Sequence, residues 1–140
     1  MNAYLFDTSA ILAHHLGENG WQEVEQAFLQ TDASFFICAI TLVELNSRLA
    51  ELAEPLPERR KILNDYRSLV SEILPVDEAV AVIAMHLRDN AKPRLPLSDA
   101  LIAACAKQRQ ATLVHRDPHF HALPQNYLPQ IQLPDKHPVT

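Results

Sequence analysis

Four acidic residues occur at positions where a chain of alternating strands and helices would bring them together. Asp7 and Asp117 each closely follow a short apolar run, and Glu44 and Asp99 each lie in the first turn of a predicted helix. Carboxylates in one pocket repel one another unless a cation neutralises them, and carboxylate oxygens are ligands that Mg²⁺ and Mn²⁺ favour. The sequence therefore predicts a divalent-metal site built from these four side chains.

Such a site would suit the hydrolysis of a phosphodiester bond. A bound metal lowers the pKa of its water ligand and neutralises charge that develops on a phosphate. Hydroxyls at Thr8 and Ser9, next to the first acid, could orient a carboxylate or a bound water. Arg116 could contact a substrate phosphate, but a solvent-exposed arginine in a turn is the favoured interpretation.

Each acid also has a purely structural interpretation. Asp7 could cap the following helix, and Glu44 could form a capping box with Thr41. Asp99 suits the positive end of a helix dipole, and Asp117 before a proline is an ordinary turn residue. These interpretations are adequate one at a time, but they do not explain why acids recur at the same topological place.

The elements that must position these acids follow from the pattern of apolar residues. Apolar runs at 3–6, 35–39 and 112–115 predict strands buried on both faces, and 130–133 alternates as an edge strand does. Apolar residues at helical spacing predict helices between them, over 9–16, 21–29, 41–52, 62–73 and 77–89, with a small, wholly apolar helix after an N-cap at Ser98. Alternating strands and helices predict an α/β fold with a mainly parallel sheet, which gathers the acids at its carboxyl edge.

The composition limits the class of protein. A chain of 140 residues is long enough for one domain with a real core. No apolar run approaches the length that spans a bilayer, and the first strand begins too early to leave room for a signal peptide, so we expect a soluble cytoplasmic protein. Cys38 and Cys105 lie in apolar runs and should be buried, reduced thiols. The formal charge of −5 argues against a large basic nucleic-acid footprint. If four of the 17 acids hold metal, however, the remaining 13 nearly balance the 12 basic residues, so the total charge does not settle the partner.

Four segments carry a resemblance to a known family: FDTSA at 6–10, TLVEL at 41–45, LSDALIAA at 97–104 and VHRDPHF at 114–120. In order and spacing the chain resembles the PIN-domain family, and within it the compact VapC-like ribonuclease toxins of type II toxin–antitoxin pairs. It departs from the family pattern in lacking a glycine over 92–96 and in carrying His115 where a threonine is common.

The resemblance implies a three-layer α/β/α sandwich and a Mg²⁺-dependent endoribonuclease, with Mn²⁺ as a possible substitute. It implies metal ligation by the four acids, with Ser9 as the hydroxyl of the site, and it implies an RNA substrate, a cognate antitoxin and a homodimer, with no membrane association. We expect a single domain over 1–134 and a loose tail over 135–140.

Two alternatives remain open at this stage, and a third, a zinc site, is set aside. A PIN-like fold could serve as a non-catalytic interaction module. A haloacid-dehalogenase-type phosphatase would use Asp7 as a nucleophile, although that family needs a second aspartate where this chain has Ser9. Three histidines, at 115, 119 and 121, could suggest zinc, but they lack a further ligand pair and are interpreted as surface or turn residues.

Overall fold

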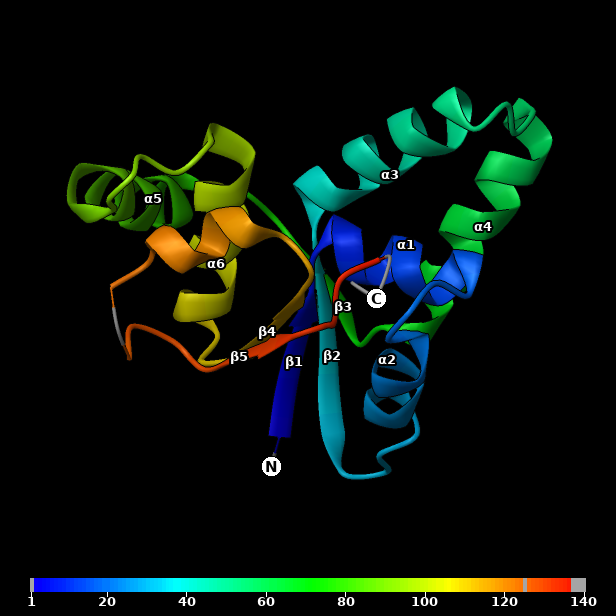
Figure 1. Ribbon diagram of the computed structural model, residues 1–140, viewed down its shortest axis with the longest axis horizontal. Coiled ribbons are helices and arrows are strands. Elements are labelled where there is room, and N and C mark those ends of the chain that lie inside the picture. Colours follow the sequence, from blue (N-terminus) through cyan, green and yellow to red (C-terminus); the bar gives the residue numbers. More distant parts are fainter. Residues whose placement is uncertain (1, 125, 137–140) are drawn as a thin grey trace.

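A parallel sheet of five strands forms the middle layer of the computed structural model, which describes residues 2–124 and 126–136. The strand order is β3-β2-β1-β4-β5 (Figure 1). In that part of the chain the strands are β1 (Asn2–Phe6), β2 (Ala33–Cys38), β3 (Glu72–Leu74), β4 (Thr112–His115) and β5 (Gln130–Gln132). The helices are α1 (Thr8–Leu16), α2 (Trp21–Phe28), α3 (Ala39–Glu51), α4 (Leu56–Leu69), α5 (Glu78–Asn90) and α6 (Leu97–Gln108), with a 3-10 turn η1 at Pro118–Ala122.

The central strand β1 divides the core between the two faces of the sheet. Successive side chains of a strand point to opposite faces, so Leu5 joins one hydrophobic cluster while Tyr4 and Phe6 join the other. Helices α5 and α6 cover the face of Leu5, and α1, α2 and α4 lie on the opposite side (Figure 1). The predicted α/β/α sandwich with a parallel sheet is confirmed.

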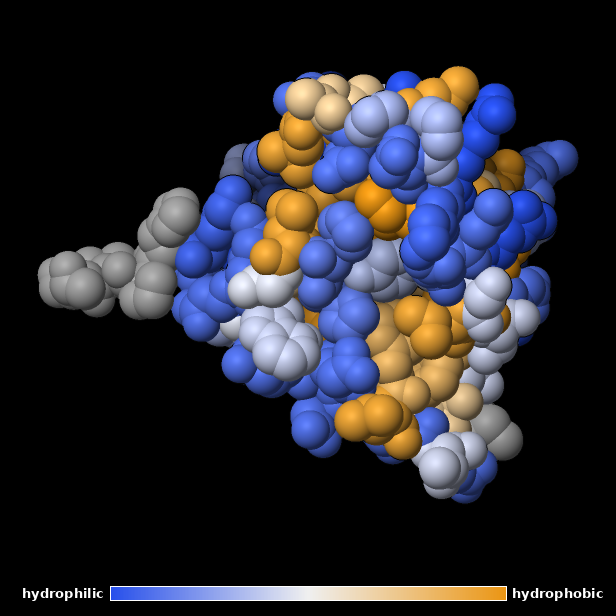
Figure 2. Space-filling model, turned by 90° about the vertical axis from the view of Figure 1, so that its right-hand side faces the viewer, coloured by the Kyte–Doolittle hydropathy of each residue, from blue (hydrophilic) through white to orange (hydrophobic). Residues whose placement is uncertain are grey.

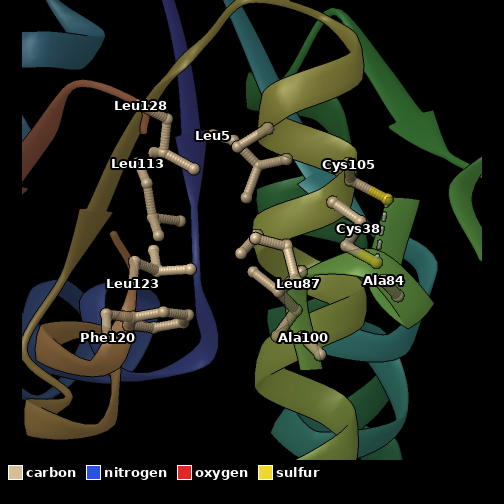
Figure 3. Close-up of a cluster of buried hydrophobic side chains, with 14 of the residues drawn as sticks. Leu5, Cys38, Ala84, Leu87, Ala100, Cys105, Leu113, Phe120, Leu123 and Leu128 are labelled. Carbon is tan, nitrogen blue, oxygen red and sulfur yellow. Dashed lines mark hydrogen bonds between the residues drawn. The ribbon is translucent and has the colours of Figure 1, made fainter. Parts of the chain in front are cut away.

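Helix α6 is buried on nearly every side, as its small apolar residues predict. Ala100 and the run 102–106 are buried in the cluster that also contains Leu5, Leu113 and Phe120 (Figure 3). Cys105 of α6 lies opposite Cys38 at the end of β2, with 3.5 Å between the two sulfur atoms. Both cysteines are free and buried, which confirms the expectation for them.

The structure corrects the end of one helix. Apolar residues at helical spacing predict a helix that continues to Ile73, but α4 ends at Leu69 and Ile73 lies in strand β3. The backbone turns extended at Val70, and the Ser71 N–H donates to the Phe35 carbonyl at 2.7 Å. Pairing with β2 therefore overrides the local helical pattern.

Helix α4 also begins earlier than predicted, at Leu56 and not at residue 62. Two predicted N-caps differ from the structure as well. Helix α3 begins at Ala39, directly after β2, so Thr41 is not an N-cap and forms no capping box with Glu44. Helix α6 begins at Leu97 behind Pro96, so Ser98 lies inside the helix. In both cases the preceding segment enters the helix earlier than the capping residue suggests. No helix among the described residues is long and apolar enough to cross a membrane.

Candidate active site

All four predicted acids line one cleft at the carboxyl edge of the sheet, with a volume of about 530 Å³. Asp7 directly follows β1, and Asp117 lies two residues beyond the end of the neighbouring strand β4. Glu44 reaches the cleft from α3, and Asp99 from the first turn of α6. The structure therefore brings together side chains that are up to 110 residues apart, as the topology of a parallel sheet predicts.

Asp7 fills a structural role and faces the cleft at the same time. Its Oδ1 accepts hydrogen bonds from the Ala10 N–H at 3.0 Å and the Ser9 hydroxyl at 2.6 Å, so it caps α1. The other carboxylate oxygen of Asp7, Oδ2, accepts no hydrogen bond. Because every fully buried side-chain oxygen among the described residues has a hydrogen-bond partner, Oδ2 is not fully buried and is open to the cleft. The side chain is only 2% exposed, and this burial raises the pKa of Asp7 to about 7, with smaller contributions from the charges of Asp117 and Asp99.

Asp99 and Asp117 lie close together, and His119 contacts both carboxylates. The Nδ1 atom of His119 lies 3.2 Å from Asp99 Oδ2 and 2.9 Å from Asp117 Oδ1. Burial, followed by the nearby charge of Asp117, raises the pKa of Asp99 to about 7. Potential ligand atoms of all three residues lie within 4.8 Å of one another. His119 lies in the turn η1 with its side chain 59% exposed, as the prediction of a surface or turn residue requires. Its proximity to the acids could be anticipated only from its place two residues after Asp117.

Two hydroxyl side chains hold the carboxylates of Glu44 and Asp7 in place. Thr8 donates a hydrogen bond to Glu44 Oε1 at 2.7 Å, which links α1 to α3. Ser9 donates to Asp7 and accepts a 2.8 Å hydrogen bond from the backbone N–H of Arg116. Ser9 thereby ties the start of α1 to the segment that follows β4.

The donor set fits a hard divalent cation. Four carboxylates and one imidazole face the same region, and no lysine or arginine in the described part of the chain forms an ion pair with any of the four acids. Two carboxyl groups with raised pKa values indicate that their negative charges are insufficiently compensated. A cation with oxygen ligands would supply the missing compensation.

His115 is buried, and its interpretation as a surface or turn residue is wrong. Its side chain is 0% exposed, and its Nδ1 accepts a hydrogen bond from the Asp117 N–H at 3.1 Å. The other ring nitrogen lies 2.8 Å from Gln130 Oε1, so Nε2 carries the proton. Burial lowers the pKa of His115 and keeps the ring neutral. The residue that departs from the family pattern thus holds the backbone of the fourth acid.

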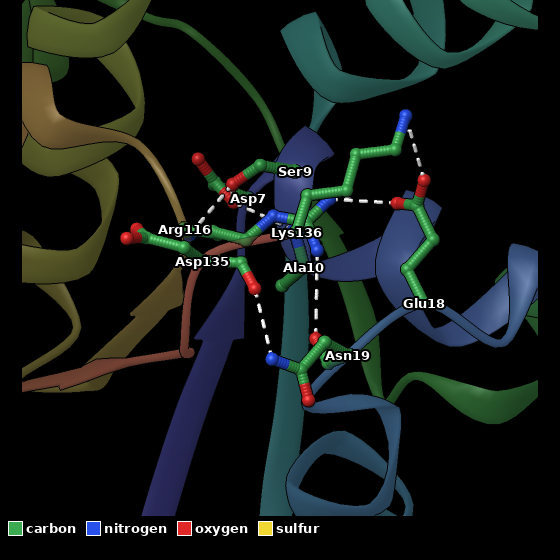
Figure 4. Close-up of polar contacts among 8 residues, drawn as sticks. All are labelled: Asp7, Ser9, Ala10, Glu18, Asn19, Arg116, Asp135 and Lys136. Carbon is green, nitrogen blue, oxygen red and sulfur yellow. Dashed lines mark hydrogen bonds and ion pairs between the residues drawn. The ribbon is translucent and has the colours of Figure 1, made fainter. Parts of the chain in front are cut away.

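Arg116 is not solvent-exposed either, contrary to the favoured interpretation. Its side chain is 12% exposed and pairs with Glu18 Oε1 at 2.6 Å, while Lys136 pairs with Glu18 Oε2 at 2.9 Å (Figure 4). Asn19 donates to the Asp135 carbonyl at 2.9 Å, so residues 135–136 lie against the α1–α2 turn. The rest of the predicted loose tail, 137–140, lies outside the described residues.

Comparisons with known proteins agree with this geometry. The PIN-domain family model matches residues 4–126. The chain is similar to VapBC2 from Rickettsia felis, which was solved bound to a DNA fragment from its promoter (20% identity, TM-score 0.76, covering 94% of this chain and 99% of that chain). It is also similar to FitAcB from Neisseria gonorrhoeae (27% identity, TM-score 0.68, covering 92% of this chain and 96% of that chain). None of the curated protein sequences matches.

A third similar structure is VapBC-5 from Mycobacterium tuberculosis, of the VapBC family of toxin–antitoxin systems (26% identity, TM-score 0.64, covering 95% of this chain and 100% of that chain). The family match excludes the haloacid-dehalogenase interpretation of Asp7, which required a different fold family. Because the match spans most of the chain and the sheet order and cleft agree with it, the chain belongs to the PIN-domain family and resembles the VapC-type toxins within it.

Proposed function

We propose that this protein is a metal-dependent endoribonuclease and the toxin of a toxin–antitoxin pair. PIN-domain proteins are nucleases, and this chain has four acids in one cleft that could serve such chemistry. The observation that carries the proposal is the convergence of Asp7, Glu44, Asp99 and Asp117 in one cleft, with two of them buried and short of compensating charge. A non-catalytic interaction module would not need this costly arrangement.

The four acids would hold the metal, with Mg²⁺ the expected ion and Mn²⁺ a possible substitute. Once bound, such an ion supplies Lewis acidity that activates water and offsets charge on the phosphate. The chain itself contributes position: Ser9 fixes the Asp7 carboxylate, Thr8 fixes Glu44, and His115 fixes the backbone of Asp117. Residues held this firmly need little reorganisation when a substrate arrives.

The proposed substrate is RNA, cut at few sites within a folded molecule. The formal charge of −5 gives weak general attraction to phosphates, which leaves recognition to local shape. The metal chemistry by itself would act on DNA as well, so the preference for RNA rests on the family resemblance. We further propose that the protein acts in the cytoplasm, where folded cellular RNA is available.

Mapping new 5′ ends in total RNA tests this proposal. The purified, partner-free chain is expected to produce cleavage at a small number of positions when Mg²⁺ is added, and none with a chelator. Little cleavage of duplex DNA is expected in parallel. Dense cleavage without preference would contradict the selective toxin, cleavage of DNA alone would contradict the ribonuclease, and no cleavage of either would favour the interaction module.

Protein partners form the second part of the proposal. The cleft has an apolar wall beside its acids, made by Leu12 and Leu16 of α1 with Val43 and Leu52 of the α3 region. Other apolar groups are exposed on the side that carries α2 and α4, scattered among polar side chains (Figure 2). Similar structures include toxin–antitoxin complexes from Klebsiella pneumoniae and Mycobacterium tuberculosis. An antitoxin that covers the apolar wall of the cleft would remove it from water and block access to the acids.

The partners can be tested in solution. We expect the chain to copurify with the product of the adjoining reading frame, and we expect light scattering of the isolated chain to give the mass of a homodimer. A monomer at high concentration would contradict the homodimer, and failure to bind the neighbouring product would contradict the antitoxin.

A further inference from the structure

Two basic residues in the loop before α6 have no partner for their side chains. All 12 lysines and arginines of the sequence lie in the described part of the chain. Within that part, most of them bind an acid, an amide or a backbone carbonyl. The exceptions, whose side chains contact no partner among the described residues, are Arg60, Arg67, Lys92 and Arg94. Arg60 and Arg67 lie on α4, whereas Lys92 and Arg94 lie in the loop before α6.

The loop that carries Lys92 and Arg94 is fixed at both ends. Ala91 and Leu95 are buried, so the loop is anchored in the core on either side of the exposed residues 92–94. The Lys92 N–H donates to the Ala122 carbonyl at 3.4 Å, and Arg88 Nε donates to the Leu95 carbonyl at 3.1 Å. The two cations are therefore presented from a defined position instead of from a free strand of chain.

This position adjoins the candidate active site. Arg94 lines a hollow of about 190 Å³ between the loop and η1, and no acidic residue lines it; its walls are Pro93, Arg94, Pro118, His119, His121 and Ala122. His119 belongs both to this hollow and to the carboxylate pair, which it contacts through Nδ1. A basic hollow and an acidic cleft thus share one residue as their common wall.

The other cations that line the cleft already bind acidic side chains. Arg116 and Lys136 share Glu18 on the α1 side, and Arg48 pairs with Glu51. A polyanionic strand that places one phosphate at the acids would therefore find cationic side chains with no acidic partner on the α6 side. Arginine suits phosphate binding because its planar guanidinium can donate two parallel hydrogen bonds to two oxygens of one phosphate.

We propose that Lys92 and Arg94 form a phosphate subsite that holds the RNA strand next to the scissile bond, on the α6 side of the cleft. This inference rests on the proposed function, because it assumes that a nucleic-acid strand crosses the acid cluster. It assigns a positioning role to a segment that holds none of the four acids. It also explains how a protein with a charge of −5 could engage a polyanion locally.

Binding to a short fluorescein-labelled single-stranded RNA tests the subsite. The D99N variant is used as the parent, in Mg²⁺, so that binding is measured without hydrolysis. Replacing both cations (K92Q/R94Q) should weaken binding by about tenfold at low salt. The slope of log K against log salt should fall by about 1.4, since each single-strand phosphate contact contributes about 0.7.

The matched control removes the same charge elsewhere. The R60Q/R67Q pair takes two partnerless arginines from α4 and should leave both affinity and salt slope close to those of the D99N parent. Equal melting temperatures for the variants would show that the loop has not unfolded. A merely structural role for Lys92 and Arg94 would lower the melting temperature without changing the salt slope.

The outcomes separate this inference from the proposed function. Loss of affinity and slope in K92Q/R94Q alone supports the subsite, even if the unmodified chain proves unable to cleave RNA. Equal losses in both pairs would indicate general charge attraction and overturn the subsite. Unchanged binding in K92Q/R94Q would also overturn it, while cleavage by the unmodified chain would still stand as evidence for the ribonuclease.

Discussion

Replacing Asp7 or Asp99 with asparagine is expected to lower Mg²⁺-dependent RNA hydrolysis by at least about 10³-fold, because changes around a metal ligand already cost about 10–100-fold. The fold should remain intact. Asparagine keeps a side-chain oxygen, so in D7N it can still accept the hydrogen bonds from Ala10 and Ser9 that cap α1. The measurement is the rate of cleavage of the mapped RNA site, with circular dichroism as the check on folding.

Asp77 provides a matched control for this experiment. It caps α5 as Asp7 caps α1, with its Oδ1 accepting from the Val80 N–H at 3.0 Å, but it does not line the acidic cleft. The D77N variant makes the same chemical change at the same kind of helix start, and it should retain full activity. Full activity in both D7N and D99N, with contaminating nuclease excluded, would contradict the assignment of the acids.

The metal-free protein is expected to lose stability as the pH rises from about 4 to about 8. The pKa of Asp7 is 3.8 in the unfolded reference and about 7 in the folded protein, and Asp99 shows the same rise. A carboxyl group with a raised folded pKa favours folding while it is protonated, so its contribution is complete below pH 4 and is lost as the pH passes through 7. Chemical denaturation in a chelator, followed across this range, measures the effect.

The D7N variant should reverse much of this loss. Since each pKa unit corresponds to about 1.4 kcal/mol, D7N should be more stable than the unmodified chain by about 2–4 kcal/mol at pH 8 and nearly equal to it at pH 4. Saturating Mg²⁺ should stabilise the unmodified chain at pH 8 and should have less effect on D7N, because the ion favours the ionised carboxylates. A flat pH profile for the metal-free chain, or a D7N protein less stable at pH 8, would contradict the burial of an uncompensated charge at this site.

The sequence by itself determined the layers of the fold and the meeting of the acids. The apolar run before Asp7 predicts a strand buried on both faces, and the small apolar residues around Cys105 predict a helix buried on all sides. In a parallel sheet the carboxyl ends of the strands lie at one edge. Acids placed just after strands, or in the first two turns of the helices beside them, therefore converge without any knowledge of side-chain packing.

Only the tertiary structure decided which other residues surround those acids. Strand β3 is three residues long, and it exists because β2 offers a free edge that the local helical pattern of Ile73 cannot reveal. The burial of His115 depends on β5 and η1, which pack around it from later in the chain.

The same holds for contacts across the cleft. Thr8 holds Glu44 from 36 residues away, and Arg116 reaches Glu18 across 98 residues. Local patterns report only which face of an element is apolar. Contacts between polar side chains on different elements depend on the distance and angle at which those elements pack. Both are set by the packing of the entire hydrophobic core, which no local pattern contains.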